Sequence, residues 1–446
     1  MSSSSITELA ARIATNTTIV NDFYTQNGLP TPSFDQASSL NPVISPSTAP
    51  EIEAARQAVI YDCQELRILM QGPAQYLASL SATELVGIQG ITRFGLAKKV
   101  PIDGEATFEQ LAAHAGIGVT HMKRVLRLAM AQHIFQEIRP GVVAHTAASR
   151  LLAEDEPLHQ WMAWKTDEGW GGAFHSCDAM ARWPDSGEPD ETGFALAHGG
   201  QGVWPYLSER PDRLRRFADM MRLFSRRPGL EAHHVVKGYP WGDLPHGATV
   251  VDVGGSHGVF TCAIAREFPS LNFVVQVRKL LVIRLNVRFM RRWRLTMVTQ
   301  DLDEGVIRDS ERQRPEELAD RVHYQVHDFM TKQPVRHADV YFFRAIFHNW
   351  SHKYALEILR NLVPALKPGA KIVMADYIIP SPDKMPKPRE AALRTGIVSM
   401  NVLFNSADRE LEEWAKLFAE ADPGFDFKGG SQPPGSDLWI LEAEWR

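Results

Sequence analysis

The feature that most constrains this chain is the alternation of strand-like and helix-like segments from Ala248 to the C-terminus. The strand-like runs are ATVVDV, NFVVQ, VHYQVHD, ADVYFFR and AKIVMADYII, and helical segments such as VFTCAIAREF and KYALEILRNLVPAL separate them. Alternation of this kind predicts a mostly parallel sheet with helices on both faces. We therefore expect an α/β fold with a Rossmann-like sheet, whose ligands bind beyond the carboxyl ends of the strands.

The turn after the first strand, GGSHG at residues 254–258, carries the first chemical signal. Gly254 and Gly258 let the backbone approach a ligand closely, and the N-terminus of the following helix favours an anion. The turn by itself fits a dinucleotide, a nucleoside or a tight connection without a ligand. In nucleotide sites an acidic residue about 20 positions later normally holds the ribose hydroxyls. The residue at that position is Val277, so the pattern is interrupted there.

An unusual basic block begins at this point and extends from Val277 to Gln300. It holds six arginines, one lysine and no acidic residue, whereas the whole chain has a formal net charge of −5. Removing the block brings Asp301 to the position where the ribose carboxylate is expected. We interpret the block as translated non-coding sequence, such as a short retained intron. The alternative is a genuine excursion from the sheet, for example an amphipathic helix that docks on a partner or a membrane.

Composition argues against several classes of function. Without the seven basic residues of the block, 41 basic residues stand against 53 acidic ones, and this balance does not predict binding to nucleic acid or to an anionic membrane. The three cysteines (Cys63, Cys177 and Cys262) lie far apart and form no CxxC or Cys/His cluster, so we expect neither a disulfide framework nor a metal site. The sequence has no leader pattern and no run of about 18 apolar residues, which favours a soluble, cytoplasmic protein.

The N-terminal region has a different pattern. Residues 106–155 read as a helix, a glycine turn, a second helix and a short β ribbon, which is typical of a winged helix-turn-helix. The second helix carries four basic or titratable residues, His121, Lys123, Arg124 and Arg127. They suit either DNA binding or the solvated face of a packing and dimerisation module. The acidic balance of the chain favours the second interpretation.

These patterns divide the chain into three regions. We expect a mainly helical, winged-helix-like region at 1–155 and a helical linker at 156–240. The sheet domain is expected at 241–446, with the basic block at 277–300 inserted in it.

With the block removed, the residues resemble a known family. It comprises the S-adenosylmethionine-dependent O-methyltransferases of the plant caffeate type and their fungal secondary-metabolite relatives, such as sterigmatocystin O-methyltransferase. The matching stretches, in order, are VVDVGGSHG, FVVQ…DL, VHDFM, YFFRAIFHNWS, LKPGAKIVMADYIIP and LFNSADRELEEW. The resemblance covers nearly the whole chain. It implies the class I methyltransferase fold, S-adenosylmethionine as cofactor and a small aromatic substrate. It also implies a homodimer formed by the region at 1–155, a substrate pocket that the linker at 156–240 helps to form, and a catalytic domain at 241–446.

The resemblance also implies roles for individual residues. Those implied for the cofactor are Asp252, Gly254, Gly258, Asp301 (ribose), Asp328 and Phe329 (adenine) and Arg344. Those implied for the acceptor and the chemistry are His348 as general base, Asp376 and Asp408 as the acids that flank it, and Met221 against the aromatic acceptor. The chain departs from the family at Ser256, where a glycine is usual, and at Asn349, where an aspartate is usual. Both flanking acids are aspartates rather than glutamates, which shortens their reach toward the imidazole.

The implied residues fit the chemistry of methyl transfer. Transfer from a sulfonium to an oxygen requires alignment of the two reactants, which lowers the barrier by roughly 7–11 kcal/mol, and removal of the acceptor proton. A neutral histidine suits a phenolic or enolic acceptor near neutral pH, and a carboxylate on its far nitrogen fixes the tautomer. The sequence therefore predicts a SAM-dependent O-methyltransferase of small aromatic metabolites, such as polyketides.

Other interpretations remain open. A methyltransferase-fold protein can bind SAM without transferring methyl, either as a pericyclase or because the block inactivates it, and a winged helix can serve a transcriptional regulator. Single residues also have structural explanations. His348 is a histidine just after a strand, Asp408 can favour the dipole of the helix that it begins, Asp328 can cap a turn, and Met221 can belong to the core.

Overall fold

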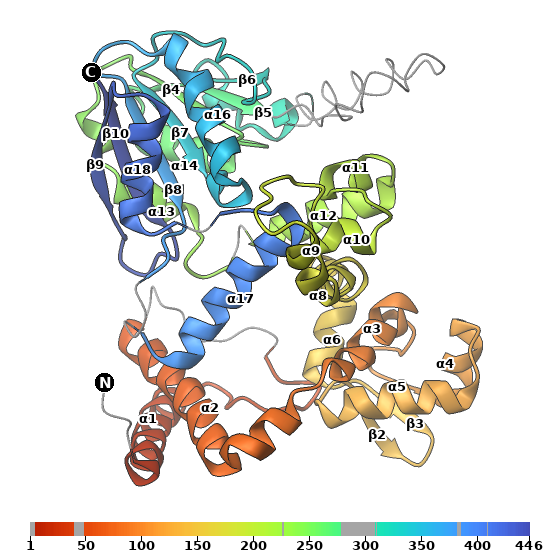
Figure 1. Ribbon diagram of the computed structural model, residues 1–446. Coiled ribbons are helices and arrows are strands. Elements are labelled where there is room, and N and C mark those ends of the chain that lie inside the picture. The colour runs from red at the N-terminus through yellow and green to blue at the C-terminus, as the bar shows by residue number, and fades with distance from the viewer. Residues whose placement is uncertain are drawn as a thin grey trace, which may run out of the picture. The chain divides into compact units, whose positions relative to one another are not determined.

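The computed structural model of the chain describes residues 5–39, 49–224, 227–277, 308, 310–380, 385–407 and 409–446. The chain divides into two compact units, and Figure 1 labels their helices and strands. The first unit comprises Met1–Gly171, Arg215–Leu223 and Pro382–Gly396, and the second comprises Gly172–Leu214, Phe224–Ser381 and Ile397–Arg446. Asp301, Asp408 and most of the basic block lie outside the described residues, so the roles predicted for them stay predictions.

The first unit begins with two helices, α1 (Ile6–Gln26) and α2 (Pro50–Ser79). The N-cap of α1 is Ser5, whose side chain accepts from the backbone of Glu8 while the Glu8 carboxylate accepts in return. Arg12 and Asp62 join the two helices through two hydrogen bonds of 2.8 and 3.0 Å. Helix α2 is kinked at Gly72, which has φ +67° and precedes Pro73. A proline inside a helix removes a backbone donor, which accounts for the kink.

The winged-helix-like pattern of the N-terminal region is confirmed. Its elements are α3 (Leu85–Arg93), β1 (Glu105–Thr107), α4 (Phe108–Ala115), α5 (Val119–Ala131), β2 (Gln136–Arg139) and β3 (Val142–Ala144). The three strands form one antiparallel sheet in the order β1-β3-β2. Two of the basic residues on the second helix have acidic partners within the module. Arg127 lies 2.9 Å from Glu137, and Lys123 lies 3.7 Å from Glu109. Paired charges of this kind favour a packing module over a DNA-binding face.

Short helices follow the winged-helix-like module. They are α6 (Ala147–Glu154), α7 (Glu156–Trp164), α8 (Trp170–Phe174), α9 (Ser176–Arg182), α10 (Gly193–Ala197), α11 (Val203–Ser208), α12 (Pro211–Phe224) and α13 (Ala232–Gly238). A π-helical turn at Lys165–Gly169 lies between α7 and α8. None of the helices in the described part of the chain is both long enough and apolar enough to cross a membrane.

The second unit contains the predicted sheet. Its strands are β4 (Thr249–Val253), β5 (Asn272–Val277), β6 (Val322–Val326), β7 (Val340–Arg344), β8 (Lys371–Asp376), β9 (Phe425–Ser431) and β10 (Trp439–Trp445). The spatial order of the seven strands is β6-β5-β4-β7-β8-β10-β9. The first five are parallel, and β10 is antiparallel to both of its neighbours. The chain order reverses between β4 and β7, so this is the switch point where such sheets bind ligands.

Helices cover both faces of the sheet, which confirms the predicted fold class. They include α14 (Val259–Glu267), α16 (His352–Leu362) and α18 (Leu411–Ala421). Helix α17 (Lys387–Phe404) belongs in part to each unit. On β7, Tyr341 and Phe343 pack into one core with α16 and α18, whereas Val340 and Phe342 pack into another with α13 and α14. Side chains of a strand alternate between the two faces of a sheet, and here both faces are buried. This explains why the strands read as continuous apolar runs.

Candidate active site

His348 and Asp376 form the best-defined pair of chemical groups in the second unit. His348 lies in a short 3-10 turn, Phe347–Asn349, just beyond β7, and Asp376 is the last residue of β8. These strands are parallel neighbours, so their carboxyl ends lie at the same edge of the sheet. The Nδ1 atom of His348 is 2.7 Å from Oδ1 of Asp376. A carboxylate accepts from an N–H group, so Nδ1 carries the proton and Nε2 is the basic nitrogen.

The surroundings of Asp376 favour its ionised form. Its side chain is 1% exposed, whereas that of His348 is 20% exposed. Backbone N–H groups of Phe347 and Tyr377 donate to the two carboxylate oxygens, each over 2.9 Å. Burial alone would raise the pKa of Asp376, but the His348 imidazole and these two hydrogen bonds lower it below its ordinary value. The pair therefore joins a fixed carboxylate to an imidazole that solvent or a substrate can reach.

Arg409 holds the turn that carries His348. Its guanidinium donates to the carbonyl oxygens of Phe347 and Trp350, both over 3.0 Å, and to that of Ala407 over 3.2 Å. The residue is 4% exposed. Two of these carbonyls flank His348 on either side, so Arg409 fixes the backbone on which the imidazole sits. Sequence reasoning missed this residue, although it follows Asp408 directly in the motif ADRE.

The backbone before His348 is strained. Ala345, between β7 and the 3-10 turn, has φ +52°. A residue with a Cβ pays roughly 1–2 kcal/mol for this left-handed conformation. The Ala345 N–H donates to the Ala375 carbonyl over 2.9 Å, which holds the strained residue against the neighbouring strand. Strain of this kind is concentrated at functional sites, where the surrounding structure compensates for it.

The glycine turn follows β4 at the switch point of the sheet. Gly254 and Gly258 have φ +83° and +70°. A Cβ atom on Gly254 would lie 2.7 Å from Ile346, and one on Gly258 would lie 2.9 Å from the Tyr324 hydroxyl. Both positions therefore require glycine for conformation and for space. Ser256, the departure from the family pattern, has φ +52°, so it takes a conformation that a glycine would take without strain.

Asp252 is a buried carboxylate at the base of this turn. It is 2% exposed and accepts a hydrogen bond of 2.5 Å from the Thr261 hydroxyl. Burial raises the pKa of Asp252 to about 6. A Cβ on Gly255 would lie 2.2 Å from the Asp252 carboxylate, so the second glycine of the turn is also needed for space. Sequence reasoning assigned roles to Gly254 and Gly258 and overlooked Gly255.

Gln276 links the glycine turn to the loop after β6. Its carbonyl accepts from the N–H groups of Gly254 and Gly255 over 2.9 and 3.1 Å. Its side-chain amide exchanges two hydrogen bonds with Gln333, 2.7 and 2.9 Å long, and a third joins it to Gln325 over 3.0 Å. Gln276 is 1% exposed, and its two bonds to Gln333 are buried, which shields them from water. The sequence carries no recognisable signal for this network.

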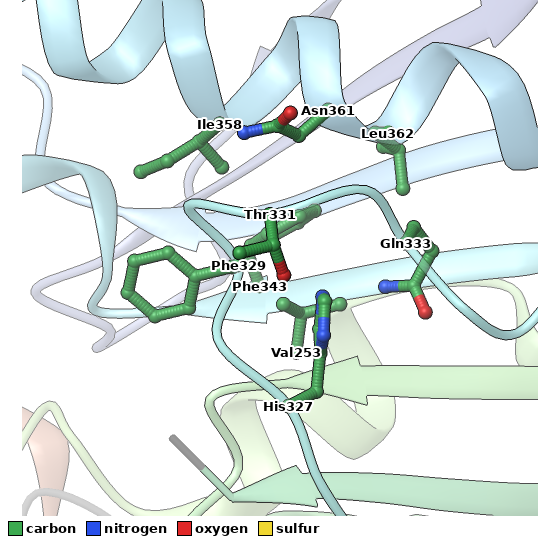
Figure 2. Close-up of a pocket in the computed structure, with 9 residues that line it drawn as sticks. All are labelled: Val253, His327, Phe329, Thr331, Gln333, Phe343, Ile358, Asn361 and Leu362. Atoms are coloured by element: carbon green, nitrogen blue, oxygen red, sulfur yellow. The ribbon is translucent and has the colours of Figure 1, made fainter. Parts of the chain in front are cut away.

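Figure 2 shows a small pocket behind the same loop. Its lining residues are Val253, His327, Phe329, Thr331, Gln333, Phe343, Ile358, Asn361 and Leu362. Val253, Phe343, Ile358 and Leu362 belong to the core between the sheet and α16. The Asn361 side-chain nitrogen is buried there without a hydrogen-bond partner among the described residues. Because its walls are mostly core side chains, we assign no ligand to this pocket.

Arg344 is a buried cation at the end of β7. Its guanidinium lies 3.6 Å from the centre of the Phe260 ring and donates to the Leu230 carbonyl over 3.0 Å. Burial lowers the pKa of Arg344 to about 10, and the nearby Tyr377 and Asp252 oppose this effect. Its Nε–H group is buried and has no partner within the described residues. A buried donor without a partner is costly, so Arg344 is suited to a polar or anionic ligand group.

Three further predicted residues can be placed. Asp328 accepts from the backbone N–H of Met330 over 3.1 Å, as the turn-capping alternative expects. Phe329 is 5% exposed, stacks edge-on against Trp350, and lies near Gly254. Met221 is 41% exposed and belongs to the first unit, whereas its neighbour Met220 is buried. The functional roles of all three stay predictions.

Comparison with known proteins points to one family. The family model that matches is an O-methyltransferase domain, over residues 293–426, a span that begins within the basic block. The grayanic acid biosynthesis cluster O-methyltransferase of Cladonia grayi is 36% identical over 445 residues, which are 99% of this chain and 88% of the relative. The O-methyltransferase pyvH of Aspergillus violaceofuscus is 36% identical over the full length of both chains. The chlorophenol O-methyltransferase of Trichoderma longibrachiatum is 32% identical over 98% of this chain and 89% of its own.

Solved structures share the fold. The crystal structure of OxaC in complex with sinefungin and meleagrin has a TM-score of 0.69 at 20% identity, and covers 98% of this chain and 99% of its own. The structure of LepI in complex with SAM has a TM-score of 0.68 at 20% identity, and covers 98% of this chain and all of its own. At this level of identity the likeness concerns the fold alone.

Proposed function

The chain belongs to the O-methyltransferase family, and we propose that it transfers a methyl group from S-adenosylmethionine to a phenolic or enolic hydroxyl of a small aromatic molecule. The observation that carries this proposal is the hydrogen bond of 2.7 Å between His348 Nδ1 and Asp376 Oδ1. It leaves Nε2 of a partly exposed imidazole as the base. The curated relatives support methyl transfer to oxygen as the reaction.

His348 is the general base in this proposal. Its Nε2 accepts the proton of the acceptor hydroxyl, and Asp376 stabilises the imidazolium that results because its carboxylate is fixed by two backbone N–H groups. Arg409 keeps the imidazole in place through the carbonyls on either side of it. A positioned base of this kind typically accelerates proton removal about 10²–10⁴-fold.

The cofactor site is proposed at the carboxyl ends of β4 to β7. When bound there, S-adenosylmethionine supplies a methyl group on a sulfonium. The residues fit it in three respects: Gly254 and Gly258 allow a close backbone approach, the Arg344 Nε–H is a buried donor without a partner among the described residues, and the loop of Phe329 is fixed to the glycine turn. Asp301 as the ribose ligand and Asp408 as the second flanking acid complete this proposal.

The acceptor is assigned as a chemical class. Chlorophenol is the acceptor named for one relative, and a histidine base suits an acidic hydroxyl such as that of a phenol. Met221 is proposed to contact the aromatic ring. A homodimer formed through residues 1–155 is also proposed, and helix α2 supports it because it exposes Leu69, Met70 and Leu77.

A second candidate is a protein that binds the cofactor without transferring methyl. Its support is that one solved structure of similar fold is described as a pericyclic reaction enzyme, with a TM-score of 0.68 at 20% identity. The His348–Asp376 pair favours methyl transfer, because a base oriented by a carboxylate is what removal of a hydroxyl proton requires.

Label transfer from methyl-labelled S-adenosylmethionine to a panel of phenols tests the proposed function. We expect labelled ether from the wild-type chain and a loss of at least about 10²-fold in His348→Ala, with cofactor binding retained. His352→Ala is the matched control, because His352 also lies 2.7 Å from a carboxylate, that of Glu420, on an exposed surface. Equal activity in wild type and His348→Ala would refute the assignment of the base.

A further inference from the structure

Three side chains that the proposed reaction does not use lie together at the start of α13. Glu231, His233 and His234 each offer one ligand atom, and these atoms all lie within 4.8 Å of one another. The two imidazole rings are side by side, with centroids 3.9 Å apart and planes at 40°. Adjacent histidines do not match the spaced ligand patterns that a sequence search relies on, which is why the sequence led us to expect no metal.

We propose that Glu231, His233 and His234 form a binding site for a transition-metal dication, with Zn²⁺ as the expected ion. In tetrahedral zinc sites, bonds of about 2.0–2.2 Å to nitrogen and oxygen place neighbouring ligand atoms about 3.3 Å apart. His234 Nε2 and Glu231 Oε2 are 3.2 Å apart, which matches that spacing. Two imidazoles and one carboxylate favour zinc, cobalt or nickel over magnesium or calcium, which prefer oxygen. The fourth position is left for water.

The surroundings hold two of these ligands in place. The backbone N–H of Gly229 donates to Glu231 Oε2 over 2.7 Å, which restricts the orientation of the carboxylate. The ring of His234 is enclosed: the residue is 8% exposed, and a Cβ on Gly435 would lie 3.4 Å from its Cε1. Outer contacts that orient the ligands are a regular part of metal sites. His233 is exposed and closes the site from the solvent side.

The charges around the trio suit a dication. Asp437 packs against Gly229, where a Cβ would lie 2.8 Å from its carboxyl carbon, so a second carboxylate lies close to Glu231. His234 and Glu231 can also form an ion pair without a metal, and His233, the neighbour of His234 in the chain, takes no part in that pair.

The site adjoins the region proposed for the cofactor. Leu230 precedes Glu231, and its carbonyl accepts from Arg344. A metal bound by the trio would thus fix the segment that Arg344 holds. We expect the ion to raise the melting temperature of the folded chain, since a ligand that binds the native state stabilises it.

Calorimetric titration of ZnCl₂ into the metal-free full-length protein tests the proposal, with the absorption spectrum of added Co²⁺ as a second readout. We expect a binding step in the wild type that Glu231→Gln and His233→Asn weaken at least about tenfold. Both variants leave the buried His234 unchanged, so the fold is preserved. The control is His352→Gln, which removes an exposed histidine paired with a carboxylate elsewhere on the same unit and is expected to bind like the wild type.

Two outcomes would overturn the proposal. One is the lack of a binding step in the wild type. The other is a step that His352→Gln weakens as much as Glu231→Gln does, because the ion would then bind histidines without preference. Neither outcome bears on methyl transfer, since the trio takes no part in the proposed reaction.

Discussion

At the scale of single residues, His348 and Asp376 show what a sequence can and cannot tell. Their types and their places after strands were available through the resemblance. A carboxylate on the far nitrogen of His348 was expected from Asp376 or Asp408. The sequence could not tell that Asp376 bonds to Nδ1, because this depends on β7 and β8 being neighbours in the sheet. The roles of Arg409 and Gln276 were not predicted from the sequence for a similar reason. Their partners are backbone carbonyls and amides that only the folded chain brings near them.

Asp252 should make the stability of the protein depend on pH. Its folded-state pKa of about 6 lies above the value of about 3.9 for an unfolded chain. Its contribution to stability is therefore fully present below about pH 4 and is lost as the pH rises through 6. Against Asp252→Asn, the free energy of unfolding of the wild type should fall by up to about 3 kcal/mol between pH 4 and pH 7. Urea unfolding at several pH values measures this difference.

Asp426→Asn is the control for this prediction. Hydrogen bonds from Lys428 and Arg446 lower the pKa of Asp426, so the stability that its carboxylate contributes is lost only as the pH falls below about 4. Between pH 4 and pH 7 the difference between the wild type and this variant should therefore stay nearly constant. Parallel pH curves for the wild type and Asp252→Asn would contradict the account.

Ser256→Gly should stabilise the protein. Ser256 has φ +52°, and glycine takes this conformation without the roughly 1–2 kcal/mol that a Cβ costs there. Part of this gain is offset because glycine has more freedom in the unfolded chain, so we expect a net increase of about 0.5–1 kcal/mol in the free energy of unfolding. Ser270→Gly, in a turn without a positive φ, should be neutral or destabilising. If Ser256→Gly proved the more destabilising of the two, the turn would not be strained as described.

At the scale of elements, the turn Phe347–Asn349 depends on Arg409. Arg409→Met should lower the free energy of unfolding by about 2–4 kcal/mol, because it leaves buried carbonyls without donors at about 1–3 kcal/mol each. It should also lower kcat and leave cofactor affinity unchanged, since His348 loses its fixed position. Urea unfolding and label-transfer kinetics measure the two effects.

Arg409→Lys is a milder change at the same position. Lysine keeps a donor for one of the carbonyls, so this variant should recover part of the lost stability and part of the lost kcat. A pH–rate profile gives a further test, because a displaced His348 no longer serves as the base and the dependence of the rate on pH changes, whereas a purely structural role for Arg409 leaves the profile unchanged. An unaltered kcat in Arg409→Met would show that the turn does not need this anchor.

The sheet itself was well predicted because both of its faces are buried. Buried parallel strands are continuous apolar runs that a sequence displays directly, as in VVDV and VYFF. The spatial order of the last two strands could not be predicted from the sequence. β10 lies between β8 and β9, and this order depends on which edge of the sheet is free. The sequence offered no structural prediction for the basic block beyond its unusual composition. The structure places the first residue of the block, Val277, in β5, where it pairs with Val326.

At the scale of the whole molecule, we predict that the block at 277–300 weakens the binding of S-adenosylmethionine. Removing it would put Asp301 in the place of Val277 at the end of β5, beside the glycine turn. We expect the shortened chain to bind S-adenosylmethionine more tightly than the full chain when each is titrated in a calorimeter. Equal binding by both would show that the block is a tolerated excursion. Weaker binding by the shortened chain would contradict its interpretation as translated non-coding sequence.

The central claim is that His348, oriented by Asp376, removes the proton of the acceptor. The pH dependence of single-turnover methyl transfer tests it most directly, in the wild type, Asp376→Asn and His348→Ala with cofactor saturating. We expect a wild-type rate that falls as the pH is lowered, because a protonated base accepts no proton, with losses of about 10²–10⁴-fold in both variants. We expect no such fall in His348→Ala. A His348→Ala profile with the same inflection as the wild type would contradict the claim.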